Sequence, residues 1–406
     1  MWLIQIAIVI IVCFVCGEYS KRLGQCKVIG EIAGGILLGP LALGTVIPSF
    51  QKQLFTPDAV VMIGQLGEVG LALLMFEIGL EISVPARRAV LGSTAIAVSG
   101  IVLPFGGGVA VAWISCSTLA PQQPFWPYIL LCGVALSVSA VPVMACIVRD
   151  LELMRHPGAS VALSSAMIGD VIGWCALSAI VCFSRVDANW RALGADIVLL
   201  CAYVLMLVVA SKWFLSRHLA RTIERGRSNG TLTFLAAAVL VSGWITSKLG
   251  FHSAFGALVL GTLLRHVPGL RQQFQQMLGG FVHSILMPVF FANAGLHMQL
   301  FGDNTRAQWY WLIAFIVVGF IGKYLGVFAG ARLAGYSREN ATVSATLMNA
   351  RGLMELIFLS IGLEFQILPT NVYTMLMIFA LFTTAMTAPL LRRSVQPVSA
   401  GVKGSI

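Results

Sequence analysis

The run Leu347-Met-Asn-Ala-Arg-Gly-Leu-Met-Glu-Leu356 places three polar side chains inside the apolar stretch 341–364. Arg351 and Glu355 are four residues apart, so on a helix they share one face and can form an ion pair. A charge at bilayer depth costs at least about 2.5–3.5 kcal/mol on insertion scales, so such a run faces protein or water. With Asn349 beside them and Gly352 as a break point, the run predicts an interrupted helix in a membrane protein. A purely structural ion pair is the alternative interpretation of Arg351 and Glu355.

A second interrupted helix is predicted in the stretch 126–148, which contains Leu136-Ser-Val-Ser-Ala-Val-Pro142. Pro142 removes one backbone donor and frees a carbonyl. Unpaired backbone is tolerated in a membrane only where it is buried in protein or lines a polar cavity. Freed carbonyls with the hydroxyls of Ser137 and Ser139 suit a hard monovalent cation. The alternative is a simple proline kink whose carbonyl is satisfied by serine.

The composition of the whole chain agrees with a polytopic membrane protein. Of the 406 residues, 58% are hydrophobic and 10% are charged, whereas soluble domains carry about 25% charged residues. The mean hydropathy is +0.90. These values exclude a soluble enzyme, a disordered chain and a coiled coil. The net charge of +10 does not indicate nucleic-acid binding, because the basic residues are dispersed in short connections.

Hydropathy, turn residues and charges predict thirteen membrane spans. Their approximate boundaries are 2–16, 28–47, 59–81, 90–116, 126–148, 159–183, 193–214, 231–248, 251–264, 279–300, 308–334, 341–364 and 372–391. Connections after odd-numbered spans, counted with the C-terminal tail and with the charges at the span ends, hold 19 Lys and Arg residues, and the other connections, counted in the same way, hold 5. Because positive residues are retained in the cytoplasm, we expect the C-terminus inside and the N-terminus outside.

Short matches between distant spans predict an internal repeat. Gly34-Gly-Ile-Leu-Leu-Gly39 corresponds to Gly256-Ala-Leu-Val-Leu-Gly261, and Gly79-Leu corresponds to Gly295-Leu. Each pair is seven spans apart, as are the two interrupted stretches. An odd offset makes the two copies face opposite ways across the bilayer, which is the inverted-topology repeat of secondary transporters.

Two charges near the middle of spans are the strongest candidates for an ion site. Asp170 is the only acid in the span 159–183, and Lys323 follows Gly322 in a span where glycines recur at 322, 326 and 330. Glycines at this spacing let another helix approach closely. Apolar surroundings disfavour an ionised carboxylate and a nearby cation favours it, so Asp170 can exchange a proton for a metal cation. We expect Lys323 to be its partner; a structural ion pair is the alternative.

Other polar residues carry weaker predictions. Glu77 and Glu68 are secondary acidic candidates inside the span 59–81. Glu31, Glu81 and Glu364 lie near span ends, which favours interfacial charges or helix caps. The cysteines and histidines show no metal-ligand spacing, and no hydrolase, phosphate-loop or dinucleotide motif is present, so we expect neither an enzyme nor a cofactor.

These segments resemble the monovalent cation/proton antiporter superfamily, in the branch of the Kef-type bacterial exchangers and plant cation/proton exchangers. The resemblance extends from about Gly30 to Leu391. It rests on GEIAGGILLGP (30–40), LMFEIGLE (74–81), ALSVSAVPV (135–143), MPVFFANAGL (287–296) and LMNARGLMEL (347–356).

The resemblance implies roles for individual residues. Asp170 matches the aspartate that binds the ion or the proton, and Ser139 falls where relatives have threonine beside the site. Lys323 matches the lysine that pairs with that aspartate. Asn349, Arg351 and Glu355 match the polar run of the second crossing helix. Gly169 departs from the family pattern, because relatives carry Asn or Asp there, and this departure leaves the transport stoichiometry open.

The implied fold is all-α, with two inverted repeats and a pair of crossing, broken helices. It implies a scaffold and dimerisation domain, an ion-translocating core that moves against it like an elevator, a linker helix and a short cytoplasmic tail. The corresponding ranges are 1–87 with 225–303, 88–184 with 304–392, 185–224, and 393–406. We expect a homodimer in lipid, in a bacterial plasma membrane, with any regulation supplied by a separate subunit.

The expected function is exchange of Na+ or K+ for protons, one for one, with the monovalent cation bound at Asp170. Three alternatives stay open. The same fold could carry an organic solute, with Arg351 holding a carboxylate. It could serve as an ion-sensing membrane receptor, or as a channel. The choice between Na+ and K+, the dependence on voltage and the direction in the cell are left open by the sequence.

Overall fold

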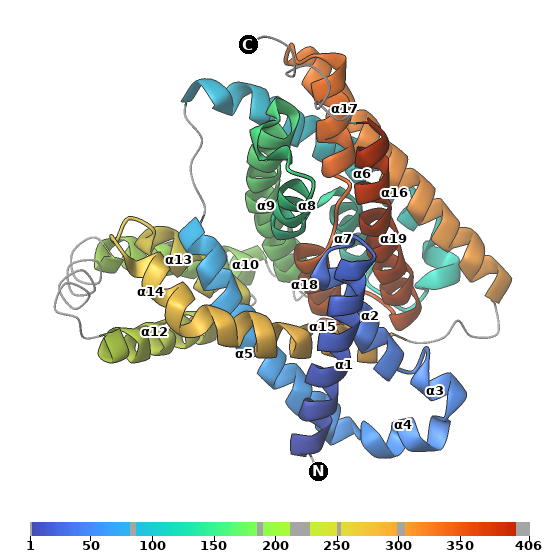
Figure 1. Ribbon diagram of the computed structural model, residues 1–406, viewed down its shortest axis with the longest axis vertical. Coiled ribbons are helices and arrows are strands. Elements are labelled where there is room, and N and C mark those ends of the chain that lie inside the picture. Colours follow the sequence, from blue (N-terminus) through green and yellow to red (C-terminus); the bar gives the residue numbers. More distant parts are fainter. Residues whose placement is uncertain are drawn as a thin grey trace, which may run out of the picture. The chain divides into compact units, whose positions relative to one another are not determined.

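The computed structural model describes residues 2–81, 87–184, 190–211, 228–249, 253–298 and 305–394. Within these ranges every regular element is helical and no strand occurs, as expected for an all-α chain (Figure 1). Part of the predicted linker, 212–224, and most of the predicted tail, 395–406, lie outside the described residues.

The chain forms two compact units, each assembled from separate segments. Unit 1 comprises Met1–Tyr19, Gly30–Val84 and Leu177–Leu300, and unit 2 comprises Ser20–Ile29, Pro85–Ala176 and Phe301–Ile406. The boundaries fall inside α1, α2 and α9, so these three helices belong partly to each unit.

Unit 1 contains the long helix α5 (Pro57–Glu81), which packs against α13 (Ser253–Leu264) and α15 (Met287–Leu296). Its other helices are α1 (Trp2–Arg22), α2 (Lys27–Leu38), α3 (Leu43–Val46), α4 (Pro48–Leu54), α10 (Trp190–Ala210), α12 (Ser228–Lys248) and α14 (Leu270–Phe274), with the π-helices η3 (Gln275–Gly279) and η4 (Val282–Leu286).

Unit 2 is centred on α6 (Arg87–Leu119) and α16 (Thr305–Leu333), which lie side by side (Figure 1). Its other elements are α7 (Phe125–Ser137), α8 (Val141–Asp150), η1 (Leu153–Arg155), α9 (Pro157–Ser184), α17 (Arg338–Leu347), α18 (Leu353–Glu364) and α19 (Thr370–Ser394).

The glycines of the predicted repeat make equivalent contacts within unit 1. A Cβ at Gly34 would lie 2.9 Å from Cys13 Cα in α1, and one at Gly256 would meet the Ser242 carbonyl in α12. In the same way Gly39 of α2 abuts Gly295 of α15, and Gly261 of α13 abuts Phe76 and Gly79 of α5. The pairs α1–α2 and α2–α15 therefore correspond to α12–α13 and α13–α5, which supports a repeated architecture.

Interrupted helices are one reason why the described spans are fewer than the thirteen predicted. Among the described residues, seven helices are long and apolar enough to cross a membrane, or eight when the pair Leu270–Gly279 and Val282–Leu296, bent by 46°, counts as one. Phe125–Ser137 and Ser253–Leu264 are shorter apolar helices, whereas α10 and α12 have 21 residues each. The 13 residues of α7 extend only about 20 Å, which is less than the roughly 30 Å of hydrocarbon. An interrupted span thus appears as two half-helices.

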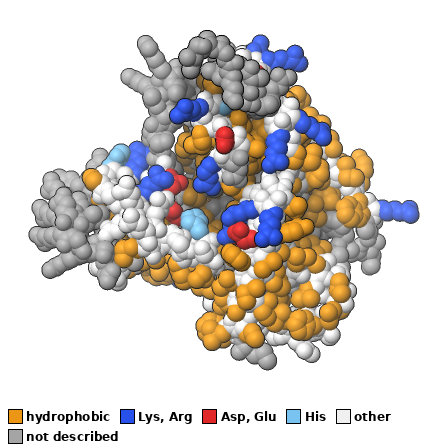
Figure 2. All heavy atoms as spheres, in the orientation of Figure 1, with side chains coloured by type: hydrophobic (Ala, Val, Ile, Leu, Met, Phe, Trp, Pro, Cys, Tyr) orange, Lys and Arg blue, Asp and Glu red, His pale blue; other side chains and the backbone are white. Residues whose placement is uncertain are grey.

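The helix α16 has one face for lipid and one for protein. Ile313, Val317, Ile321 and Leu325 recur every four residues and are between 46% and 57% exposed. On another face Gly322, Gly326 and Gly330 contact Pro104, Ser99 and Ile96 of α6, so the predicted close approach of a second helix is confirmed. Figure 2 shows hydrophobic side chains over much of the face in view. Exposed apolar stripes of this kind suit a bilayer.

Candidate functional site

Two interrupted helices cross in unit 2. The first interruption, residues 138–140, separates α7 from α8, and the second, residues 348–352, separates α17 from α18. Val138 and Ala140 have extended backbones. A Cβ on Gly352 would lie 2.7 Å from Val143 Cγ2, so glycine allows the two interrupted segments to approach each other here. Four helix ends, with their unpaired backbone groups, therefore meet in one place.

Hydrogen bonds join the two interruptions directly. The Ala140 amide donates to the Ala350 carbonyl at 3.0 Å. The Ser139 hydroxyl donates to the Met348 carbonyl at 2.8 Å, and Ser139 is 5% exposed. The Ser137 hydroxyl instead donates within its own helix, to the Val134 carbonyl at 2.9 Å. The two predicted serines thus have different positions: only Ser139 connects the crossing segments.

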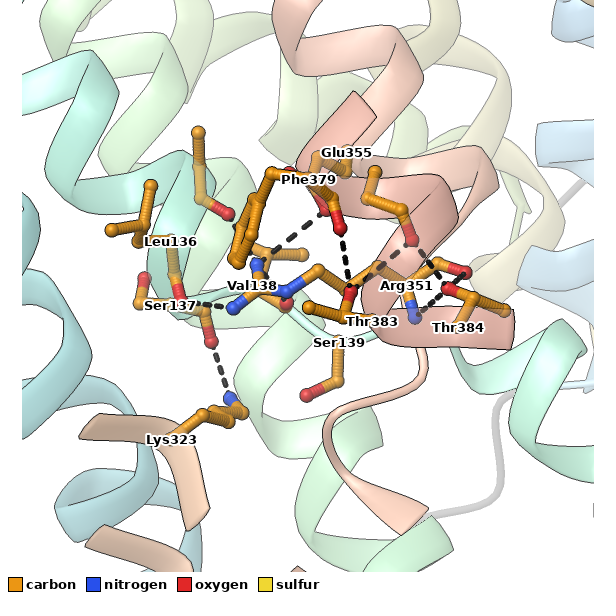
Figure 3. A network of polar contacts seen from close by, with 12 residues as sticks. Leu136, Ser137, Val138, Ser139, Lys323, Arg351, Glu355, Phe379, Thr383 and Thr384 are labelled. Carbon is orange, nitrogen blue, oxygen red and sulfur yellow. Dashed lines mark hydrogen bonds and ion pairs between the residues drawn. The ribbon is translucent and has the colours of Figure 1, made fainter. Parts of the chain in front are cut away.

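Arg351 is the centre of a polar network at the end of α7 (Figure 3). Its guanidinium donates from Nη1 to the carbonyls of Ala135 (2.5 Å) and Val138 (3.1 Å), and from Nη2 to the carbonyl of Leu136. Ala135 and Leu136 lie in the last turn of α7 and Val138 is its C-cap, at the negative end of the helix dipole, which favours a cation. Arg351 therefore caps the half-helix that the interruption exposes.

Three further contacts hold Arg351 in this orientation. Nη1 lies 3.5 Å from Glu355 Oε2, so the predicted four-residue ion pair is present but long. The guanidinium carbon lies 4.3 Å from the ring centroid of Phe379, a cation–π distance. The Thr384 hydroxyl accepts from the Arg351 amide at 2.8 Å and lies 2.7 Å from the Arg351 carbonyl.

Lys323 supplies a second cation at the end of α7. Its ammonium donates to the Ser137 carbonyl (Figure 3), and its side chain is 1% exposed. Lys323 also interacts electrostatically with Asp170, Arg351 and Glu355. Within the described residues its recorded hydrogen bond goes to this carbonyl, and none joins it to Asp170. The ammonium therefore lies within electrostatic reach of the candidate carboxylate while neutralising a helix end.

Asp170 lies on α9 beside the crossing. Gly173, one turn further along the same helix, faces Val138 at the first interruption, with a distance of 3.1 Å from a built Cβ to Val138 Cγ2. The Asp170 Oδ1 atom is buried and has no hydrogen-bond partner among the described residues. Buried polar atoms normally have a partner, so an unpaired carboxylate oxygen is consistent with a position that holds an ion or a proton.

Asn349 and Glu355 place two more oxygen atoms near the interruptions. The Asn349 amide nitrogen donates to the Ala345 carbonyl at 3.0 Å, which satisfies the end of α17. Asn349 Oδ1 and Glu355 Oε1 are both buried without a hydrogen-bond partner within the described ranges. Beside Asp170, Gly169 has room, because a Cβ there would meet only Ile101 Cδ1, at 3.7 Å.

Pro142 has a different role from the one that the sequence indicated. It lies in the first turn of α8, where its missing amide hydrogen removes no helical hydrogen bond. The interruption itself comes before it, at residues 138–140. The proline therefore begins the second half-helix and does not kink a continuous one.

Sequence reasoning did not identify Thr384 and Phe379, which contact Arg351 from α19. Their signal was weak, because Phe379 resembles any apolar residue of a span. Thr384 belongs to a threonine series at 383, 384 and 387, all buried. A series of hydroxyls in an apolar span could have indicated a helix that faces the polar network.

The secondary acids Glu77 and Glu68 belong to unit 1. Glu77 is buried, with its Oε2 atom 3.1 Å from His283 Nε2 and its Oε1 atom 3.2 Å from Gln275 Nε2. Glu68 is exposed on α5. Among the acids near span ends, Glu81 and Glu364 are exposed, as expected for interfacial charges, whereas Glu31 is buried.

Comparisons with known proteins agree with this arrangement. The family described as sodium/hydrogen exchanger, transmembrane, matches residues 7–393. The chain is 32% identical over 396 residues to the Na+/H+ antiporter NhaS4 of Synechocystis, covering 96% of this chain and 95% of that protein. It is 33% identical to cation/H+ antiporter 20 of Arabidopsis thaliana, covering 95% of this chain but only 47% of that protein, so the chain spans about half the length of this relative.

A solved structure shows a similar fold. The sodium/proton antiporter MjNhaP1 of Methanocaldococcus jannaschii superimposes with a TM-score of 0.62, covering 96% of each chain at 15% identity. At this identity the likeness concerns the fold alone. The family match over nearly the whole chain and the identity to NhaS4 are sufficient for assignment: the chain is an integral membrane protein of the sodium/hydrogen exchanger family.

Proposed function

We propose that this protein exchanges a monovalent cation, Na+ or K+, for protons across a membrane. The observation that carries the proposal is the buried, unpaired Oδ1 of Asp170, on the helix that packs against the first interruption. NhaS4, its relative, is a Na+/H+ antiporter by name. The Asp170 carboxylate would accept either the cation or the proton, and because both ions need the same oxygen atoms, one must leave before the other binds.

The neighbouring groups have distinct roles in this mechanism. Ser139, whose hydroxyl joins the two interruptions, and the exposed carbonyls would complete the shell around the cation. Lys323 lies within electrostatic reach of Asp170, so its ammonium would stabilise the ionised carboxylate when no cation is bound. Arg351 and Glu355 act as positioning residues, because they fix the end of α7.

The same geometry does not favour transport of an organic anion. In that alternative, Arg351 would hold the carboxylate of the solute. The two terminal nitrogens of Arg351 are already directed at three backbone carbonyls and Glu355, within a side chain that is 1% exposed. No contact in the described structure favours a receptor or a channel.

The wider assembly follows from the same proposal. Unit 2 would be the moving core, with unit 1 as the scaffold and dimerisation surface, in an elevator-type mechanism. The protein would act as a transporter without enzymatic activity or a bound cofactor, as a homodimer in a bacterial plasma membrane, with a separate subunit as its possible regulator. Its C-terminus would be cytoplasmic and its N-terminus outside, as the distribution of Lys and Arg indicates.

Transport by purified protein in liposomes tests the proposal. A pH-sensitive dye inside the vesicles would report proton flux after addition of Li+, Na+, K+ or Rb+. We expect cation-dependent flux from the wild type, and flux no greater than that of empty liposomes from Asp170→Asn. The matched control is Asp58→Asn, which makes the same chemical change at an exposed position of α5. Wild-type flux from Asp170→Asn would falsify the assignment.

A further inference from the structure

The turn between α1 and α2 has a fixed shape. The Gln25 amide donates to the Ser20 carbonyl at 3.0 Å and the Gly24 amide donates to the Lys21 carbonyl at 2.9 Å, which together form a Schellman motif at the end of α1. Gly24 has φ = +72°, a left-handed conformation that glycine adopts without strain. A Cβ at this position would also lie 2.6 Å from Arg392 Nη2.

This turn packs on the C-terminal half of α19, 360 or more residues away in the sequence. Gln25 Nε2 donates to the Ala385 carbonyl at 3.1 Å, and Arg392 Nη2 donates to the Gly24 carbonyl at 3.3 Å. Cys26 is 4% exposed and belongs to the same apolar cluster as Ala388 and Leu391. The turn is therefore held on α19 by polar and apolar contacts together.

Five cations lie on the two segments that this contact joins, and we call them the basic cluster: Lys21, Arg22 and Lys27 at the turn, and Arg392 and Arg393 in the last turn of α19. Arg22, Arg392 and Arg393 are exposed. Within the described part of the chain, Arg22 and Arg393 form no ion pair, and the recorded hydrogen bond of Arg392 goes to an uncharged carbonyl. Glu18, one turn earlier on α1, offsets one charge.

We propose that the basic cluster binds the phosphate headgroup of an anionic lipid. Its cations stand at the ends of two apolar, membrane-crossing helices, α1 and α19, which is the depth of lipid phosphates. Guanidinium groups match phosphate oxygens in charge and in geometry. Two cations at one helix end would suffice to balance the dipole of that helix. The packing of the turn on α19 joins two such helix ends, so this site has more positive charge than the dipole of either helix requires.

A lipid at this position would connect two parts of the fold. Ser20–Ile29 belongs to unit 2, although the helices that it joins continue into unit 1. A headgroup that contacts cations of both the turn and α19 would fasten the turn to α19. The anionic lipid content of the membrane would therefore regulate how firmly this connection is held, independently of which ion the protein transports.

Thermal stability of the purified protein tests this site without any transport assay. Dioleoyl phosphatidylglycerol is titrated into detergent-solubilised protein, with dioleoyl phosphatidylcholine and inorganic phosphate in parallel. The test variant is the triple change Arg22→Gln, Arg392→Gln, Arg393→Gln. Its matched control is Arg155→Gln, Arg306→Gln, Arg338→Gln, which removes the same number of exposed guanidinium groups from other positions of unit 2.

Phosphatidylglycerol should raise the unfolding temperature of the wild type and of the control more than phosphatidylcholine does, with saturation. One cation near an anionic surface contributes on the order of a fivefold change in affinity, so the test variant should bind on the order of a hundredfold more weakly.

Equal shifts for the two triple variants would overturn the site. A shift with inorganic phosphate alone would indicate a soluble anion and overturn the assignment to lipid. If the test variant does not fold, single Arg22→Gln and Arg393→Gln variants, each about fivefold weaker than wild type, decide the question; wild-type affinity in both overturns it.

Discussion

At the scale of single residues, Arg351 is held mainly by backbone. Its terminal nitrogens contact three carbonyls at the C-terminal end of α7, those of Ala135, Leu136 and Val138, while Glu355 lies at 3.5 Å. Removing a buried cation leaves these acceptors and the carboxylate without a partner, which costs more than the loss of the ion pair alone. The arginine and the glutamate are therefore unequal partners.

Substitution of each partner tests this inequality. We expect Arg351→Gln to lower the free energy of unfolding by about 3–5 kcal/mol, as for a broken buried pair. Glu355→Gln should cost about 1 kcal/mol or less, because the neutral amide is easier to bury and the carbonyl contacts remain. The measurement is unfolding by sodium dodecyl sulfate in mixed micelles. Equal losses for both variants would show that the ion pair dominates the network.

At the scale of elements, the two interrupted helices depend on contacts between their breaks. Ser139 bonds across the crossing to the Met348 carbonyl, whereas Ser137 bonds to its own helix. We expect Ser139→Ala to cost about 1 kcal/mol of stability and to slow exchange, and Ser137→Ala to be nearly neutral in both. Thermal unfolding and vesicle flux of the two variants provide the comparison. If Ser137→Ala has the larger effect, the crossing contact is not the important one.

The close contacts in unit 1 give a second prediction at this scale. A methyl group at Gly261 would overlap the carbonyl oxygen of Phe76, and one at Gly39 would lie 2.6 Å from the carbonyl oxygen of Gly295. Each Gly→Ala change should destabilise the protein by about 1–3 kcal/mol through overpacking. Gly106→Ala is the control, since nothing lies within 4 Å of its built Cβ, and it should be neutral or stabilising by up to about 1 kcal/mol. Similar melting temperatures for all three variants would contradict the packing.

Much of this arrangement could be predicted from the sequence, because it rests on residues that recur at a helical period or on charges that cost free energy in an apolar span. Glycines at 322, 326 and 330 predicted the contact between α16 and another helix, and charges in apolar spans predicted Lys323, Arg351 and Glu355 as candidates. Sequence letters could not reveal the carbonyls of Ala135, Leu136 and Val138 as the partners of Arg351, because backbone groups occur at every residue. The π-helices η3 and η4 were missed for a similar reason, since their pattern is as apolar as that of an ordinary span.

At the scale of the whole molecule, charge balance decides whether voltage drives transport. Asp170 is the only acid of its predicted span, and Gly169 stands beside it. A single carboxylate that carries one cation in one direction and one proton in the other moves no net charge. We therefore expect the proposed exchange to be electroneutral.

Currents on a solid-supported membrane test this expectation. A jump in Na+ or K+ concentration should produce proton flux without a transport current in the wild type. Gly169→Asp adds a second carboxylate where a side chain has room, 3.7 Å from Ile101 Cδ1. This variant should carry an additional proton in each cycle and generate a current. A wild-type current that follows the flux would rule out one-for-one exchange.

The central claim, that cation and proton compete for Asp170, is tested most directly by proton release on cation binding. Purified protein in weakly buffered detergent solution receives Na+ or K+, and a pH indicator counts the protons set free. Wild type and Asp58→Asn should release protons in proportion to the cation bound and reach saturation, while Asp170→Asn should release none. Undiminished release from Asp170→Asn would contradict the account, because the shared site would then lie elsewhere.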